Sequence, residues 1–442
     1  MDNLHETEIG TIAPNWKQST LGDVAKFQTG GTPSRNEPKY WEKGDIPWVK
    51  TGEIDYRVID VTEEKITRMG LESSSTKVFR AGTLLVAMYG QGVTRGRAGI
   101  LGIDAATNQA CAAIMPHDEN EILTRFVYFF LQYQYEALRQ MGHGANQRNL
   151  NMALLRGFPI AYPPLSEQRR IAGVLGLVQR AVEQQERLRT LVAELKQTLL
   201  HHLFTHGLRG EPQKPTDLGP IPQSWDVVKL GDYLTEAQYG ISVKGAQSGD
   251  HALLRMTNQK RGRITSENLQ FVSLPPTQFE KFRVEKHDIL FNRTNSLELV
   301  GRTAIFDLVG DFVFASYLIR LRTDASRLRP HFLNHYFNCE ETQTRLKSIA
   351  TRAVSQSNIS ATRLRGFVVP VPTPAEQDEV VETIDCLDCK REVHVRKHSS
   401  LTSLFRTLLH QLMTAQLRVS DLNVESLLGS AISDSSRRLV SD

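Results

Sequence analysis

Two long segments of the chain carry apolar residues at the spacing of a coiled-coil helix. In residues 165–207 the a and d positions of a heptad are taken by Ile171, Val174, Val178, Ala181, Leu188, Val192, Leu195 and Leu199. Residues 373–415 have a poorer stripe, made of Val380, Leu387, Leu401, Leu404 and Leu408. Such a narrow stripe is typical of a helix that packs against one partner helix. The pattern predicts two long antiparallel helices, the first of them roughly 60 Å in length.

Polar residues interrupt both stripes near their midpoints. In an antiparallel pair, Gln185 of the first helix would lie near His394 and Lys397 of the second. We expect this polar layer to fix the register, so that Gln185→Leu should raise stability or loosen the register. Other apolar residues of the two helices fall outside the stripe and either form a docking surface for a partner or only complete the internal core, namely Leu175, Leu191, Phe204, Phe405 and Leu412.

The chain is an internal duplication. At an offset of 209 residues, Trp16 matches Trp225, Gln168 matches Gln377, and the motif Leu-Arg-Gly-Phe at 155–158 recurs at 364–367. Inside the two copies the offset falls to 205, where the Gly-Arg pair at 96–97 matches that at 301–302. The outer parts therefore agree at one offset while the interiors differ in loop length and in most residues. This pattern indicates that the outer part of each copy, here called the frame, is repeated, whereas the interior differs between the copies.

The repeat divides the chain into seven parts: a tail at 1–13, a globular domain at 14–164, a long helix at 165–208, a linker at 209–221, a globular domain at 222–372, a long helix at 373–418 and a flexible tail at 419–442. Within the globular domains, 82–88 and 288–291 are predicted strands, and 125–141 and 330–347 are predicted helices. The expected fold class is α/β (α+β), with two duplicated domains separated by the two long helices.

Composition places few limits on the partners. With 442 residues, the chain predicts two or more domains, and its net charge of +4 permits a nucleic-acid partner without requiring one. Four scattered cysteines do not form a disulfide scaffold and indicate reduced, cytosolic thiols. No run of 18 apolar residues and no signal segment is present, so no membrane partner is expected and the predicted location is the cytoplasm.

The sequence lacks the motifs of the common catalytic sites. It contains no Gly-Lys dipeptide, hence no phosphate-binding P-loop, and no GxSxG, HExxH or amino-methyltransferase motif. Three Glu-x-Lys pairs do not follow convincing strands and do not support a nuclease. Neither Cys386-x-x-Cys389 nor the histidines His201, His202, His206 and His410 complete a metal site, so no bound metal is expected. An enzyme is thus the weakest of the functional hypotheses.

Glycine-containing loops in both domains instead carry hydrogen-bonding and basic residues. Arg side chains read guanine edges, Asn and Gln read adenine, and Lys, Ser and Thr hold phosphates. The candidate DNA-binding residues are Thr32, Ser34, Arg35, Lys50, Thr51, Tyr89, Gln91, Arg95, Arg97, Gln147, Arg148 and Asn149 in the first domain. Those of the second are Tyr239, Lys244, Arg255, Thr257, Asn258, Lys260, Arg261, Arg293, Asn295, Arg302, Gln356 and Asn358.

These features together resemble the specificity subunit of type I restriction–modification enzymes, over nearly the whole chain. The motifs that carry the resemblance are Trp16 with Leu-Gly-Asp at 21–23, Gly-Gly-Thr-Pro-Ser at 30–34, Pro-Trp-Val at 47–49, Pro-Pro-Leu-Ser-Glu-Gln at 163–168 and the long helix that follows. The second domain has Tyr-Gly-Ile-Ser-Val-Lys at 239–244 where the first has its glycine–proline loop.

The resemblance implies a non-catalytic subunit with two target recognition domains. It would bind double-stranded DNA, dock two copies of a methyltransferase subunit and, in the full complex, the motor-nuclease subunits. S-adenosylmethionine would belong to the methyltransferase subunit, and ATP and Mg to the motor-nuclease subunit, so that this chain itself binds no cofactor. The methyltransferase would flip the target adenine.

Each domain is then expected to read one half of a split, asymmetric DNA site, with an unread gap set by the helices. Inserting one heptad into both helices should lengthen the gap and leave the half-sites unchanged. The alternative is an orphan DNA-recognition or scaffold protein that acts without a methyltransferase.

Overall fold

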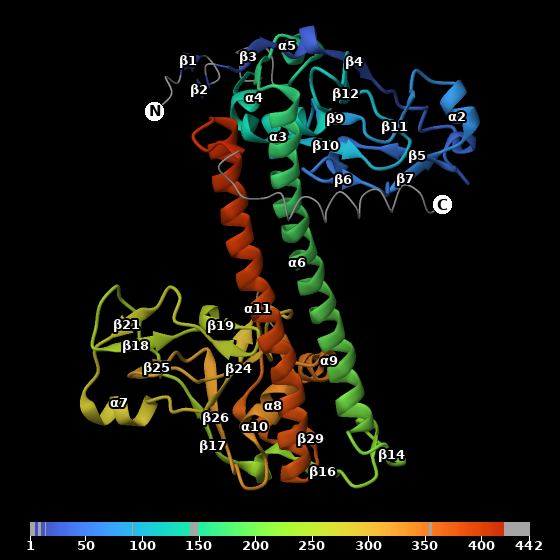
Figure 1. Ribbon diagram of the computed structural model, residues 1–442. Coiled ribbons are helices and arrows are strands. Elements are labelled where there is room, and N and C mark those ends of the chain that lie inside the picture. The colour runs from blue at the N-terminus through green and yellow to red at the C-terminus, as the bar shows by residue number, and fades with distance from the viewer. Residues whose placement is uncertain are drawn as a thin grey trace. The chain divides into compact units, whose positions relative to one another are not determined.

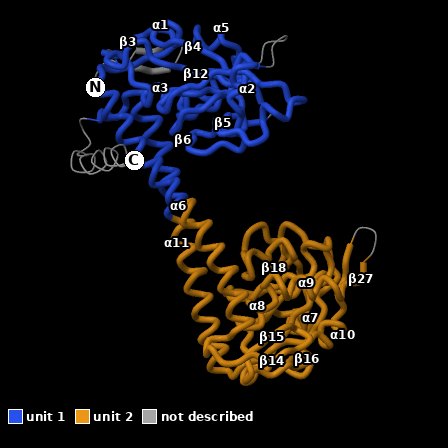
Figure 2. Tube along the Cα trace, turned by 90° about the vertical axis from the view of Figure 1, so that its right-hand side faces the viewer, with its two compact units in different colours: residues 1–185, 397–442 blue, residues 186–396 orange. Residues whose placement is uncertain are grey.

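The computed structural model describes residues 5–7, 10–13, 15–90, 92–141, 149–352 and 356–419. The chain forms two compact units, unit 1 with residues 1–185 and 397–442, and unit 2 with residues 186–396 (Figure 2). The two longest elements, α6 (Leu165–His206) and α11 (Pro374–Met413), each run without interruption from one unit into the other (Figure 1). The expectation of two long helices is confirmed.

Unit 1 has two mixed sheets, ordered β4-β12-β9-β10-β6 and β7-β5-β11-β8. Its strands are β1 (His5–Thr7), β2 (Gly10–Ile12), β3 (Lys17–Thr20), β4 (Ala25–Thr29), β5 (Ile46–Val49), β6 (Val58–Ile59), β7 (Glu64–Ile66), β8 (Val78–Phe79), β9 (Leu84–Ala87), β10 (Ala98–Leu101), β11 (Ala105–Thr107), β12 (Cys111–Pro116) and β13 (Pro159–Tyr162). Its short helices are α1 (Leu21–Val24), η1 (Pro38–Tyr40), η2 (Thr51–Glu53), α2 (Arg68–Glu72), α3 (Thr124–Tyr133), α4 (Tyr135–Met141) and α5 (Met152–Arg156).

Unit 2 repeats this plan with sheets ordered β17-β26-β22-β24-β20-β19 and β21-β18-β25. Its strands are β14 (Gln213–Thr216), β15 (Gly219–Pro222), β16 (Asp226–Lys229), β17 (Leu234–Tyr239), β18 (His251–Leu254), β19 (Gln259–Lys260), β20 (Arg263–Ile264), β21 (Gln270–Val272), β22 (Ile289–Asn292), β23 (Thr294–Asn295), β24 (Thr303–Ile305), β25 (Phe312–Phe314), β26 (Leu318–Thr323), β27 (Thr351–Arg352), β28 (Ser357–Asn358) and β29 (Val368–Val371). Its short helices are η3 (Leu230–Tyr233), η4 (Met256–Asn258), α7 (Pro276–Phe282), α8 (Pro330–Phe337), α9 (Glu340–Ser348) and α10 (Ala361–Arg365).

The long helices pack antiparallel inside each unit. In unit 1 the first turns of α6, with Ile171 and Leu175, share one core with Phe405 and Leu412 near the end of α11. In unit 2 the last turns of α6, with Leu203, share a core with the first turns of α11. The apolar stripes are therefore buried mainly toward the helix ends, where the globular domains add further apolar surface to the pair.

Several helix residues depart from their predicted environments. Leu195 was expected in the stripe but is 54% exposed, and Leu191 beside it is 48% exposed. Four of the five predicted docking residues are instead buried within their own unit; they are Leu175, Phe204, Phe405 and Leu412. The cause is the globular domains, which cover these faces, a contact that helical spacing alone does not reveal. The Gln185 layer falls at the boundary between the units and stays a prediction.

The duplicated frame repeats down to single hydrogen bonds. In unit 1 the buried amide of Gln168 accepts from the Leu123 N–H at 2.9 Å and donates to the carbonyls of Glu121 and Pro163. In unit 2 the buried amide of Gln377 accepts from the N–H of Arg329 at 2.7 Å and donates to two carbonyls in the same way. Each glutamine ties the start of a long helix to the loop before the domain's main helix, because buried backbone groups need such partners.

A β-hairpin precedes the frame in both units, at positions expected to be a tail and a linker. In unit 2, β14 pairs with β15 in the register Lys214↔Ile221, and in unit 1, β1 pairs with β2 in the register His5↔Ile12 (Figure 1). The registers coincide at the 209-residue offset. The sequence holds the signal, since Thr-x-x-Gly at 7–10 recurs at 216–219. The Pro and Gly residues of 209–221 therefore form a hairpin rather than an irregular linker.

Two predicted helices are broken in the structure. The helix expected at 125–141 is divided into α3 and α4 at Gln134, and the one expected at 330–347 is divided into α8 and α9 at residues 338–339. Helical periodicity persists through each break, so the pattern of apolar residues does not show it. Among the residues that the structure describes, no helix is long and apolar enough to span a membrane.

Candidate nucleic-acid interface

Loops that are far apart in the sequence of unit 1 meet at the ends of the sheet strands. The Gly31 N–H donates to the Thr107 carbonyl at 2.9 Å, and the Asn108 N–H donates to the Val49 carbonyl at 3.1 Å. The Leu150 N–H donates to the carbonyl of Met88, which brings the loop after β9 to the same edge of the unit. This edge, formed by the loops at the strand ends, is the rim of unit 1. The candidate residues Thr32, Lys50, Thr51, Tyr89 and Asn149 lie on these loops.

One part of this rim is an open pocket of about 540 Å³, lined by Thr32, Arg35, Lys50 and Thr51. The Arg35 guanidinium lies 3.7 Å from the centroid of the Trp41 ring and pairs with Glu64. These contacts set its orientation, since a planar guanidinium stacks on an aromatic face. Ser34 is exposed beside the pocket.

Carboxylates hold the pocket's cations in the free chain. The Lys50 Nζ lies 2.7 Å from the Glu63 carboxylate and 2.9 Å from that of Glu64. The hydrogen bond from Arg35 lowers the pKa of Glu64, and the hydrogen bond to Glu63 raises the pKa of Lys50. A DNA phosphate entering the pocket would therefore have to compete with Glu63 and Glu64 for these cations.

The remaining candidates of unit 1 lie on the β9–β10 hairpin and near α5. Tyr89 is 43% exposed, Asn149 is exposed, and Arg97 pairs with Asp55. Arg95 is half-buried and donates to the backbone of α4. Gln91, Gln147 and Arg148 lie outside the described residues.

In unit 2 the corresponding rim is organised around Arg293, which follows β22. Its guanidinium lies 4.6 Å from the centroid of the Tyr239 ring and donates to the Asn358 side chain at 3.3 Å. Tyr239 is 40% exposed, and its hydroxyl accepts from the backbone of α10 at 2.8 Å. Asn295 lies on β23 opposite Ser357 of β28, and its amide donates to the Met256 sulfur at 3.0 Å. Arg293, Tyr239 and Asn358 are thus brought together by neutral contacts, with Asn295 on the neighbouring strand.

The glycine loops of the two units are equivalent, although their sequences differ. A Cβ at Gly30 would lie 1.9 Å from the Thr107 carbonyl oxygen, and a Cβ at Gly240 would lie 2.4 Å from that of Phe314. Both positions therefore require glycine. A β-bulge between Leu234 and Glu236 adds one residue in unit 2, and this shift hides the match in the sequence.

Asn258 is not available to a DNA base. Its side chain is fully buried, accepts from the Arg255 N–H at 2.9 Å and donates to two carbonyls. In unit 1 the carboxylate of Glu53 accepts a hydrogen bond from the Lys50 N–H at 2.7 Å in the equivalent way. Asn258 is thus a turn-stabilising residue, and residue type alone did not distinguish this role from base recognition.

The other candidates of this turn remain accessible. Arg255 is half-buried and donates to a backbone carbonyl, Thr257 is exposed, and Lys260 pairs with Glu267. Lys244 and Gln356 are exposed on separate loops.

Arg261 and Arg302 lie in a second pocket of about 530 Å³ in unit 2, which sequence reasoning did not find. Lys196 of α6, Lys347 of α9 and Arg391 of α11 also line it, together with the carboxylates of Glu298, Glu340 and Asp388, so that cations outnumber carboxylates. Burial, together with the nearby Arg261 charge, lowers the pKa of Arg391. Crowded cations of this kind favour an anionic ligand such as a phosphate.

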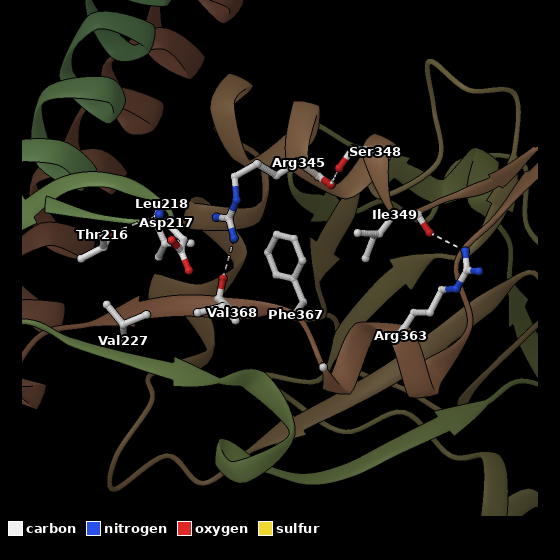
Figure 3. A pocket seen from close by; sticks show the side chains of 11 residues that line it. Thr216, Asp217, Leu218, Val227, Arg345, Ser348, Ile349, Arg363, Phe367 and Val368 are labelled. Carbon is white, nitrogen blue, oxygen red and sulfur yellow. Dashed lines mark hydrogen bonds between the residues drawn. The ribbon is translucent and has the colours of Figure 1, made fainter.

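A third pocket, of about 880 Å³, lies between the β14–β15 hairpin and the α9–α10 region (Figure 3). The Arg345 side chain donates to the Val368 carbonyl at 2.9 Å, and that of Arg363 donates to the Ile349 carbonyl at 2.7 Å. Thr216 and Asp217 of the hairpin also line the pocket. Both arginines are held by backbone carbonyls, and the pocket walls contain no arrangement of nucleophile and base.

The residues considered earlier as metal ligands have other contacts. His201 faces Glu341, His202 stacks on His206 with ring centroids 4.7 Å apart, and His410 lies 5.9 Å from the Tyr133 ring. The thiols of 386 and 389 are exposed on α11.

Comparisons with known proteins agree with this architecture. A family model for the type I restriction modification DNA specificity domain matches residues 14–191 and again 222–402. The S subunit of the type I restriction–modification system of M. genitalium superposes with a TM-score of 0.59 at 17% sequence identity, covering 90% of this chain and 96% of that one. A second solved structure, reported under complex assembly and conformational transition of the type I R-M system, gives a TM-score of 0.52 at 18% identity, covering 92% and 99%.

The sequence relatives are specificity subunits of type I restriction enzymes. That of MjaIX from Methanocaldococcus jannaschii is 27% identical over 52% of this chain and 54% of its own length, so this match spans about half of the relative. That of EcoKI from Escherichia coli (strain K12) is 21% identical over 86% of this chain and 83% of its own length. With two matches that together cover most of its length, the chain belongs to the family of type I restriction modification DNA specificity proteins.

Proposed function

We propose that this chain is the DNA sequence-specificity subunit of a type I restriction–modification complex. The observation that carries the proposal is the presence of two rims of exposed and half-buried Arg, Lys, Asn and Tyr side chains on one duplicated frame. Each rim would read one half of a bipartite site, because its residues are those that recognise base edges and phosphates. Since the side chains of the two rims differ, the two half-sites would differ as well.

The rims differ in how their central arginines are held. In unit 1, Arg35 lies over Trp41 and is paired with Glu64, whereas in unit 2 the guanidinium of Arg293 is held by Tyr239 and Asn358. Contact with an aromatic ring orients each guanidinium, whose N–H groups would exchange their present partners for two parallel hydrogen bonds to guanine. The basic pocket of Arg261 and Arg302 would hold the phosphate backbone beside the second half-site.

The duplicated outer frame supports docking of two copies of a methyltransferase subunit. The hairpins and the starts of the long helices are repeated, while the rims differ between the two units. Two copies of one partner, each binding in the same way, would explain why the same outer surface occurs in both units. The exposed Leu191 and Leu195, one turn apart on α6, offer an apolar contact for such a partner.

The chemistry of modification would belong to the partners. The methyltransferase subunit would supply S-adenosylmethionine, and a motor-nuclease subunit would supply ATP and Mg. This chain would select the site and would itself be non-catalytic, acting in the same compartment as the DNA.

The test is co-expression with the candidate methyltransferase subunit, followed by single-molecule sequencing of methylated bases in the host DNA. The expected result is methylated adenine in a split, asymmetric motif. Replacing residues 14–164 by the matching domain of another family member should change one half of the motif only. A stable complex that leaves DNA unmodified would favour the orphan recognition or scaffold alternative, and absence of a complex would contradict the partner assignment.

The role of α6 and α11 as a ruler stays a prediction. Insertion of one heptad into both helices is expected to lengthen the unread gap by whole base pairs with both half-sites intact. A change in either half-site would contradict it.

A further inference from the structure

Three segments of unit 2 bring two histidines and a carboxylate together at one point. The Nδ1 atom of His287, in the turn before β22, lies 3.1 Å from the Nε2 atom of His331 on α8. The same Nδ1 lies 3.5 Å from the carboxylate of Asp307, which follows β24. All three ligand atoms lie within 4.8 Å of one another. No spacing in the sequence joins these residues, which is why sequence reasoning overlooked them.

These separations suit a tetrahedral metal ion. Zinc binds histidine nitrogen and carboxylate oxygen at about 2.0–2.2 Å, so two ligands of a tetrahedral ion lie roughly 3.3 Å apart. The distances from His287 to its two partners fall on either side of that value. Two imidazoles and one carboxylate form a ligand set typical of divalent zinc-class ions, with a fourth position left for water.

The backbone at His287 supplies a second, independent observation. His287 occupies the left-handed region with φ +71°, at the third position of a turn closed by the hydrogen bond from Asp288 N–H to the Glu285 carbonyl. That position strongly favours glycine. In unit 1 the equivalent residue is Gly82, with φ +87° and the matching backbone hydrogen bond to Leu101. Unit 2 therefore places a histidine where the frame otherwise has glycine.

The other two positions also differ between the units. At the same 205-residue offset Asp307 corresponds to Gly102, and at the start of the domain's main helix His331 corresponds to Arg125. The frame of unit 1 therefore folds without any of the three side chains. A strained backbone is kept where a function requires the side chain, and the strained residue here is one that binds metals.

Two other carboxylates nearby, those of Asp385 and Asp388, are held in ion pairs with cationic side chains or histidine. Asp385 is bound by His335 at 3.1 Å and by Arg263 at 3.4 Å, and Asp388 is bound by Lys196 at 2.6 Å. Arg263 also lies 3.6 Å from Asp307, on the oxygen opposite to the one facing His287. Arg263 therefore contacts Oδ2 of Asp307, and Oδ1, which faces His287, is left for a metal ion.

We propose that His287, Asp307 and His331 form a binding site for one divalent transition-metal ion such as Zn²⁺ in the second recognition domain. The ion joins the turn before β22, the end of β24 and the first turn of α8. Because β22 leads directly into Arg293, the ion stabilises the strand that presents the recognition rim of unit 2. This site goes beyond the proposed function, and the chain can recognise DNA whether or not the site exists.

The test uses the full chain after chelator treatment, titrated with Zn²⁺ by calorimetry and with Co²⁺ by visible absorption. One ion per chain and the absorption of tetrahedral Co²⁺ are expected. His287→Gly, His331→Ala and Asp307→Asn should each weaken Zn²⁺ binding at least tenfold. His287→Gly is the sharpest variant, because it installs the residue that unit 1 uses and so leaves the fold intact.

The matched control is the double variant His202→Ala/His206→Ala, which removes an exposed histidine pair on α6 and should leave Zn²⁺ binding unchanged. Zn²⁺ should raise the melting temperature of the native chain and not that of His287→Gly. Failure of the native chain to bind Zn²⁺, or binding of Zn²⁺ by His287→Gly and His331→Ala as tightly as by the native chain, would overturn the site.

Discussion

Gln168 in unit 1 and Gln377 in unit 2 make the same three hydrogen bonds through their side chains, whereas Gly82 and His287 share a backbone conformation and a backbone hydrogen bond but differ in side chain. The first pair belongs to the frame and the second to the variable parts that the frame supports. Positions that satisfy buried backbone groups are repeated because their loss is costly. Positions on the rims are free to differ, so the two domains can recognise different ligands.

The same contrast appears in the cations of the two rims. In unit 1 Arg35, Lys50 and Arg97 are each paired with a carboxylate, whereas Arg95 donates to a backbone carbonyl. In unit 2 Arg293 is held by neutral groups, and no ion pair of Arg261 or Arg302 is found within the described ranges. If both rims bind DNA as proposed, the first would exchange protein ion pairs for phosphate contacts, while the second would meet DNA with its central arginine not neutralised by a carboxylate.

Breaking the frame should have the largest effect. Gln377→Leu removes three hydrogen bonds and leaves a buried N–H and two carbonyls without a partner, which should cost about 3 kcal/mol of unfolding free energy. Gln168→Leu should cost a similar amount. Hydrogen exchange followed by mass spectrometry would place the loss in unit 2 for the first variant and in unit 1 for the second. Gln197→Ala, at an exposed position of α6, is the control. Clearly unequal costs would show that the two frames are not energetically equivalent.

Changing a rim should affect recognition and leave the frame unaltered. Arg293→Ala is expected to lower affinity for the cognate DNA by about 10- to 100-fold, the range for loss of a bidentate base contact. The effect should be confined to one half-site, as measured by binding of the complex to oligonucleotides with single half-site changes. The control is Arg327→Ala, which removes an exposed arginine that stacks on Tyr233 at 3.9 Å. An equal loss in both variants would argue against a base contact by Arg293.

The left-handed turns should respond in opposite directions. Gly82→Ala is expected to destabilise unit 1 by about 1 kcal/mol, because no neighbouring atom lies within 4 Å and only the backbone conformation is penalised. His287→Gly should stabilise the metal-free chain by less than about 1 kcal/mol. Urea unfolding in the presence of a chelator would measure both. Destabilisation by His287→Gly without metal would contradict the assignment of strain at this turn.

Removing an acid from the first rim should give the smallest effect. Glu64→Gln frees Arg35 and should raise DNA affinity by about two- to threefold, as expected for partly exposed ion pairs that contribute under 1 kcal/mol. The pKa of Glu64 is lowered, so its pairing is fully present above the ordinary glutamate range and is lost only as the pH falls through the lowered value. The gain should therefore be constant between about pH 6 and 8. In unit 2, Glu267→Gln beside Lys260 is the matched comparison.

Much of the frame could be predicted from residue patterns. The heptad stripes identified α6 and α11, because a helix of such length needs a continuous apolar face whatever the rest of the fold. The duplication was visible because Trp16 and Trp225 fill equivalent places in the two cores, while Gln168 and Gln377 satisfy equivalent buried backbone groups. The resemblance drawn from these motifs is confirmed by the family match.

Only the tertiary structure decided which side chains reach the surface together. Residue type could not separate the buried Asn258 from the accessible Asn295, since both lie in polar loops and burial depends on neighbours distant in the sequence. A single-residue bulge concealed the equivalence of Gly30 and Gly240. The cluster of His287, Asp307 and His331 arises where a turn, a strand end and a helix start converge. Local periodicity therefore determined the long helices and the repeated frame, whereas long-range packing determined the sites that the frame carries.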